Sequence, residues 1–89
     1  MKKLALGQLV ATPGALAAIE ASGDSLLEYV TLHEFGWWGE VDTHDWNENE
    51  YALKHDLRIL SVYTLSSGVR IWIITEADRS TTLLLPEEY

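Results

Sequence analysis

Residues 57–76, LRILSVYTLSSGVRIWIITE, contain two runs of β-branched and aromatic residues on either side of a short polar loop. Such runs are typical of β-strands, and a loop that ends in Gly68 allows the positive φ of a hairpin turn. Residues two apart in a strand share a face, and the second run is apolar at alternate positions. The stretch therefore predicts a hairpin of strands Leu57–Leu65 and Val69–Glu76.

The chain after this hairpin predicts a structural turn and a last strand. Glu76, Asp78 and Arg79 belong to the turn sequence TEADRS, in which Asp side chains accept bonds from nearby backbone N–H groups. Arg79 is expected to pair with Glu76 or with a carboxylate of residues 40–50. Thr81–Leu85 then has the composition of a strand, and the proline that follows ends it.

On the other side of the hairpin, the N-terminal part of the chain predicts a strand and a helix. Leu4–Ala11 alternates loosely between apolar and small or polar residues, as a short strand does. Thr12 followed by Pro13 is a helix start, and Gly23 is suited to the left-handed residue that ends the helix after about Ser22. The inward face of this helix is expected to comprise Leu16, Ile19, Ala15 and Ala18.

Two more helices are predicted between this helix and the hairpin. Asp24 is the expected N-cap of a helix that runs to about Phe35, and the glycines around Trp37-Trp38 form a rigid aromatic corner. Asp42 or Thr43 is the expected N-cap of the next helix, which ends near His55. On this helix, Trp46, Asn49 and Leu53 share one face, Asn49 points inward, and Glu50 is placed to pair with Lys54.

The resulting order is β-α-α-α-β-β-β over a chain of 89 residues. No linker, low-complexity tract or internal repeat divides the chain, so residues 1–89 are expected to form a single acidic domain. The order predicts an α+β fold with the helices on one face of a mainly antiparallel sheet of three to four strands.

Composition restricts the cellular setting. The sequence has no cysteine, which suits a reducing compartment, and polar residues with a proline interrupt the apolar run that a secretory leader needs. No segment approaches the roughly 18 uninterrupted apolar residues of a membrane span. These features predict a cytoplasmic protein without a membrane partner.

The net charge of −8 is unevenly distributed. Residues 4–53 contain nine Asp or Glu and no Lys or Arg, whereas residues 54–89 contain five acids and four bases. An acidic field repels nucleic acid and attracts a basic surface. Direct DNA or RNA binding is therefore disfavoured, and a basic protein partner, for example a nucleic-acid-binding complex, is favoured.

The segment HEFGWWGEVDTHDWNENEY, residues 33–51, contains six acids and three of the four tryptophans without a Lys or Arg. Two interpretations are open: a solvated acidic surface with tryptophans in the core, or a surface whose carboxylates imitate phosphates and occupy a basic channel. The nine acids without a base in residues 4–53 favour the second interpretation, which implies an inhibitor with an apolar anchor. The residues expected to bind the partner are Glu34, Trp37, Trp38, Glu40, Asp42, Asp45, Glu48 and Glu50.

The sequence offers weaker patterns for other chemistry. His33, His44 and His55 recur every eleven residues near Asp42 and Asp45, but glycines separate them and no zinc motif is present, so solvated or capping roles are favoured over a metal site. Neither a nucleophile elbow nor a phosphate loop occurs, and no cofactor is expected. The alternative function is a small enzyme; its candidate residues are Glu40, Asp42, Glu76, Asp78 and Arg79.

Three stretches, WGEVDTHDWNENEYAL, RILSVY and WIITEADRSTTLLLPEEY, carry a resemblance over nearly the whole chain. The chain resembles a family of small acidic proteins of plasmids and integrated elements, usually labelled plasmid-related and sometimes type I restriction subunit. The family has no established activity. The resemblance implies a bacterial or phage mobile element, a setting in which small acidic proteins include inhibitors of restriction and CRISPR complexes. Plasmid maintenance is a further possibility that it implies.

Overall fold

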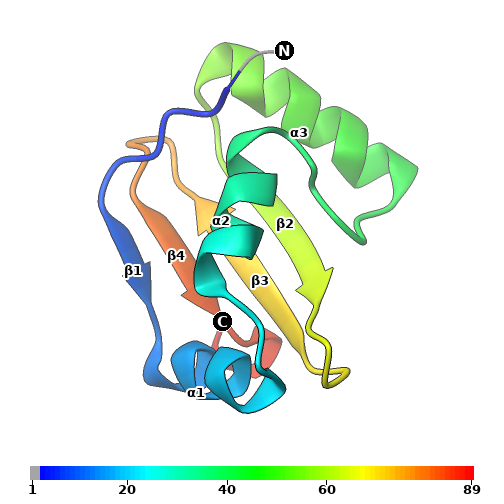
Figure 1. Ribbon diagram of the computed structural model, residues 1–89. Helices are drawn as coiled ribbons and strands as arrows, with labels where there is room; N and C mark the ends of the chain where they lie inside the picture. Colours follow the sequence, from blue (N-terminus) through cyan, green and yellow to red (C-terminus); the bar gives the residue numbers. More distant parts are fainter. Residues whose placement is uncertain (1–2) are drawn as a thin grey trace.

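The predicted hairpin is present in the computed structural model, which describes residues 3–89, and forms one half of a four-stranded sheet (Figure 1). The strand order is β1-β4-β3-β2, and β2 and β3 pair antiparallel from Ile59 opposite Thr75 to Thr64 opposite Arg70. The predicted α+β fold and its β-α-α-α-β-β-β order are confirmed. The elements are β1 (Leu9–Ala11), α1 (Pro13–Ser22), α2 (Leu26–Glu34), α3 (Thr43–His55), β2 (Ile59–Thr64), β3 (Arg70–Thr75), β4 (Thr81–Leu84) and the 3-10 helix η1 (Pro86–Glu88).

The first strand is shorter than predicted. Only Leu9–Ala11 pairs, parallel to β4, and the preceding residues of the predicted strand Leu4–Ala11 follow another course. Leu4 is buried, and its N–H donates to the carbonyl of Glu34 at the end of α2 (2.8 Å). The parallel pairing makes the sheet mixed. The sequence predicts that the N-terminal stretch is not a secretory leader. The first two residues of that stretch, Met1 and Lys2, lie outside the described residues.

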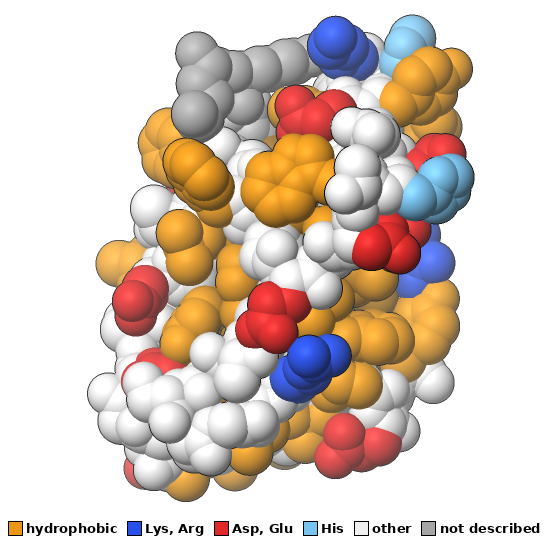
Figure 2. All heavy atoms as spheres, turned by 90° about the vertical axis from the view of Figure 1, so that its right-hand side faces the viewer, with side chains coloured by type: hydrophobic (Ala, Val, Ile, Leu, Met, Phe, Trp, Pro, Cys, Tyr) orange, Lys and Arg blue, Asp and Glu red, His pale blue; other side chains and the backbone are white. Residues whose placement is uncertain are grey.

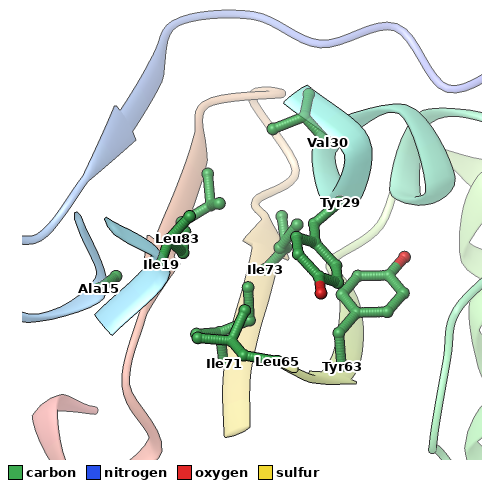
Figure 3. Close-up of a cluster of buried hydrophobic side chains, with 9 residues drawn as sticks. All are labelled: Ala15, Ile19, Tyr29, Val30, Tyr63, Leu65, Ile71, Ile73 and Leu83. Atoms are coloured by element: carbon green, nitrogen blue, oxygen red, sulfur yellow. The ribbon is translucent and has the colours of Figure 1, made fainter. Parts of the chain in front are cut away.

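One face of the sheet carries the core, which α1 and α2 cover (Figure 3). Helix α3 packs along the outer edge of β2, where the Asn49 side chain accepts from the Leu60 N–H (3.2 Å) and donates to the Leu60 carbonyl (2.7 Å). Alternate residues of β2, β3 and β4, among them Ile71, Ile73 and Leu83, are fully buried under α1 and α2. Ala52 and Leu53 of α3 form a second buried cluster with Leu4, Trp38 and Ile59. On α1 the inward face is Ala15 with Ile19, while Leu16, predicted to face inward, is 46% exposed.

Two of the three predicted helix N-caps are present in the structure. Thr12 accepts a bond from Ala15 N–H, and Asp42 accepts one from Asp45 N–H, so both predicted N-caps are confirmed. Asp24 does not cap α2, whose N-cap is Ser25. Its carboxylate instead accepts bonds from the Ser66 N–H (2.8 Å) and hydroxyl (2.5 Å) and from Tyr29 (2.5 Å), so it ties the start of α2 to the hairpin turn. These bonds lower the pKa of Asp24.

The outer edge of β2 is covered by the aromatic corner. Val62 N–H donates to the Trp38 carbonyl (3.0 Å), and Glu40 N–H donates to the Val62 carbonyl (2.7 Å), which forms a parallel bridge at Gly39. Gly39 adopts a φ of 78°, a conformation that glycine tolerates best. This pairing removes part of the free edge through which a sheet could add another strand.

None of the helices within residues 3–89 is long and apolar enough to cross a membrane.

Candidate interaction surface

Helix α3 lies between two clefts with aromatic walls. The first, here called the Trp37 cleft, has a volume of about 310 Å³ and is lined by Phe35, Trp37, Trp46, Glu50, Leu53 and Lys54. The second, here called the Trp72 cleft, has a volume of about 340 Å³ and is lined by Asp45, Glu48, Asn49, Arg58, Leu60, Trp72, Ile74 and Tyr89. The α3 residues of the two clefts alternate along the helix, so each flank of α3 forms one wall.

Trp37 and Trp38, both predicted as partner anchors, have opposite environments. Trp37 is 56% exposed beside its cleft. Trp38 is fully buried, its ring lies edge-on 5.6 Å from the His33 ring, and its Nε1–H donates to Glu50 Oε2 (2.8 Å). The expectation that Trp38 offers an accessible anchor is therefore wrong, because this indole fills the core under the aromatic corner. Trp46 is half-buried against the same cluster.

Four of the six acids of the predicted binding segment have partners within the protein. Glu34 pairs with Lys3 (3.1 Å) and Glu40 with Arg70 (3.2 Å), Asp42 caps α3, and Glu50 accepts the Trp38 bond rather than pairing with Lys54 as predicted. Asp45 and Glu48 are exposed on α3, and within residues 3–89 neither has a Lys or Arg partner; Glu48 lies 3.7 Å from His44. Figure 2 shows acidic side chains spread singly among hydrophobic ones on the face that it displays.

The predicted turn is present, with a different partner for Arg79. Ser80 donates two bonds to Asp78 through its N–H (2.9 Å) and hydroxyl (2.7 Å), and these bonds lower the pKa of Asp78. The Arg79 guanidinium donates to the Asp56 carboxylate (3.0 Å) and to the Leu57 carbonyl (2.8 Å). The expected pairing with the Glu76 side chain or with residues 40–50 is wrong, because the turn lies over the C-terminal end of α3.

The residues of the alternative enzyme site are not brought together. Glu40 binds Thr64 and Arg70 near the hairpin end, whereas Glu76 pairs with Arg58 (3.6 Å) at the other end of the strands. Neither cleft is lined by any of the five candidates. The three histidines are also apart, and no group of three or more His, Asp or Glu in residues 3–89 is arranged to hold a metal ion.

A buried polar network that the sequence did not predict lies under α2. His33, fully buried, has Nδ1 at 2.5 Å from Ser61 Oγ and Nε2 at 2.8 Å from Thr75 Oγ1. Thr75 in turn lies 2.9 Å from Thr81, whose hydroxyl donates to the Arg79 carbonyl (3.3 Å). Burial lowers the pKa of His33 to about 4. The only signal in the sequence was that Thr75 falls on the apolar face of its strand.

Comparison of the chain with protein-family models, with curated proteins and with solved structures gives no significant match.

Proposed function

We propose that the protein is a non-enzymatic interaction protein that binds a basic protein surface through α3 and the Trp37 cleft. The observation that carries the proposal is the position of Trp37, a large aromatic side chain that is 56% exposed beside a cleft whose lining is mainly apolar and also includes Glu50 and Lys54. Aromatic residues of this kind supply much of the binding energy at protein interfaces. The lack of any Lys or Arg in residues 4–53 gives this part of the chain its preference for a basic partner.

Fewer carboxylates are available to a partner than the sequence suggests. Lys3 and Arg70 offset Glu34 and Glu40, and Asp42 and Glu50 hold the fold together. The outward carboxylates of α3, those of Asp45 and Glu48, remain to meet a partner. This arrangement favours an anchored protein interface over imitation of a regular row of phosphates, which would need evenly spaced and unpaired carboxylates.

The biological setting that we propose is a bacterial or phage mobile element, with the protein inhibiting a nucleic-acid-binding defence complex of the anti-restriction or anti-CRISPR kind. A complex that holds DNA or RNA must present a basic surface, and that surface has the charge that the α3 carboxylates would attract. Rim charges of this type act mainly on the rate of association, and an apolar anchor acts on the lifetime of the complex. A role in plasmid maintenance through the same surface is compatible with this chemistry.

The test is affinity capture from the host cell with the natural protein, Trp37→Ala and a matched variant, Leu27→Ala. Leu27 is 68% exposed on α2, so both substitutions shorten an exposed apolar side chain. We expect Trp37→Ala to lose the captured partner by roughly tenfold or more, and Leu27→Ala to retain it. Equal recovery by both variants would contradict the proposal.

A further inference from the structure

We propose that the Trp72 cleft binds an arginine side chain of the partner, so that the partner contacts α3 on both flanks. This inference rests on the proposed function, since it supplies a second contact for the same basic partner. The Trp37 cleft would take an apolar group, and the Trp72 cleft would take the charged one.

The floor of the Trp72 cleft is apolar and aromatic. Leu60, Trp72 and Ile74 come from β2 and β3 and lie on the sheet face opposite the helix-covered core. The Tyr89 ring forms a side wall, with its centroid 5.6 Å from that of Trp72 and the two planes at 60°. Trp72 is half-buried, so part of its ring remains available to a ligand.

The rim of the cleft on the α3 side is acidic. Asp45 and Glu48 both line it, and both are exposed without a Lys or Arg partner in the described chain. Arg58 forms the opposite wall, where it pairs with Glu76 (3.6 Å) and donates a hydrogen bond to the Tyr89 hydroxyl. The cleft therefore combines an aromatic floor with two carboxylates, neither of which forms an ion pair with a Lys or Arg of the described chain, while the one base in its lining, Arg58, pairs with Glu76 instead.

Guanidinium is the cation that fits this combination best. It is flat enough to stack on an indole, and it donates in a fork that matches carboxylate oxygens. An internal cation–π contact of this kind is already present in the Trp72 cleft, because the Arg58 guanidinium lies 5.0 Å from the centre of the Tyr89 ring. A second copy of the chain is a poor occupant, because each copy carries a net charge of −8.

The test uses the four tryptophan indole N–H signals in a two-dimensional NMR titration with the peptide acetyl-Ala-Arg-Ala-amide. Trp72 reports on its own cleft, whereas Trp37 and Trp46 report on the other. We expect the Trp72 signal to move and to saturate. We expect the isosteric citrulline peptide, which lacks the charge, to bind at least roughly tenfold more weakly.

The matched variants are Asp45→Asn with Glu48→Gln, and Glu20→Gln with Glu28→Gln, which remove the same charge from exposed positions on α1 and α2. Only the first pair should weaken the arginine peptide, by about tenfold. A static Trp72 signal, movement confined to Trp37 and Trp46, or equal effects of the two pairs would overturn the inference. If capture still depends on Trp37 while this titration fails, the arginine cleft is wrong and the proposed interface stands.

Discussion

The Trp38 indole donates its N–H to the Glu50 carboxylate at 2.8 Å, which joins the buried aromatic corner to the middle of α3. Trp38 and Glu50 were both expected to contact a partner. The bond shows that they contact each other and stabilise the fold. It also fixes α3 relative to Trp37, the neighbour of Trp38, and so holds one wall of the Trp37 cleft in place.

Replacement of Trp38 by Phe should destabilise the protein by about 1–3 kcal/mol, because it leaves the Glu50 carboxylate without its donor and opens space in the core. The exposed Trp37, replaced by Phe, should change the free energy of unfolding by less than about 0.5 kcal/mol. Urea unfolding of the two variants measures the difference. Equal stabilities would mean that the Trp38–Glu50 bond contributes nothing.

Gly39 should be far less tolerant of alanine than Gly36, although both have positive φ, 78° and 84°. A Cβ on Gly39 would lie 1.9 Å from the Val62 carbonyl oxygen, whereas a Cβ on Gly36 meets nothing closer than 3.6 Å. We expect Gly36→Ala to cost about 1–2 kcal/mol from backbone strain alone and Gly39→Ala at least about 2 kcal/mol more. Thermal unfolding of both variants tests the bridge that covers the β2 edge, and similar losses would contradict it.

Stability should rise with pH between about 4 and 6.5, because the pKa of His33 is lowered to about 4 by burial from an ordinary value of 6.5. In this window the unfolded chain binds the proton and the folded protein does not, so acidification favours unfolding. The full effect is of the order of 3 kcal/mol. Urea midpoints across this range should show the slope in the natural protein and in His44→Gln, and should lose it in His33→Gln. A slope that survives in His33→Gln would assign the effect elsewhere.

The network around His33 also predicts its tautomer. Thr81 donates to the Arg79 carbonyl, so Thr75 must donate to Thr81 and accept from His33 Nε2–H, which leaves Nδ1 to accept from Ser61. Nitrogen-15 NMR at neutral pH should therefore show a protonated Nε2 and a bare Nδ1. The opposite assignment would reverse the direction of the chain of bonds.

Features that depend on a few adjacent residues could be predicted from the sequence. The hairpin follows from two apolar runs and Gly68, and the helix ends follow from Thr12, Gly23 and Asp42. A first strand was predicted at Leu4–Ala11, but its short extent and its parallel pairing could not be predicted, because they depend on Thr81 and its neighbours more than sixty residues away.

The candidate surface was harder to predict for the same reason. An acid is available to a partner only if no base from a distant part of the chain pairs with it. Arg70 pairs with Glu40 and Lys3 pairs with Glu34, and neither pairing follows from the local sequence. Hydrophobic pattern alone could not distinguish exposed Trp37 from buried Trp38, since adjacent residues at a corner have no common period. The Trp72 cleft joins α3 to β2 and β3 and has no local signature at all.

In the proposed interface, the outward acids Asp45 and Glu48 of α3 bind a basic partner. The most direct measurement is the affinity of the captured partner for Asp45→Asn with Glu48→Gln, compared with Glu20→Gln with Glu28→Gln, at low and high salt. We predict that Asp45→Asn with Glu48→Gln binds the partner about tenfold more weakly than the natural protein at low salt, and that the difference in affinity is smaller at high salt. Glu20→Gln with Glu28→Gln should bind like the natural protein at both salt concentrations. Equal binding by the two pairs, or an affinity that does not change with salt, would contradict the claim.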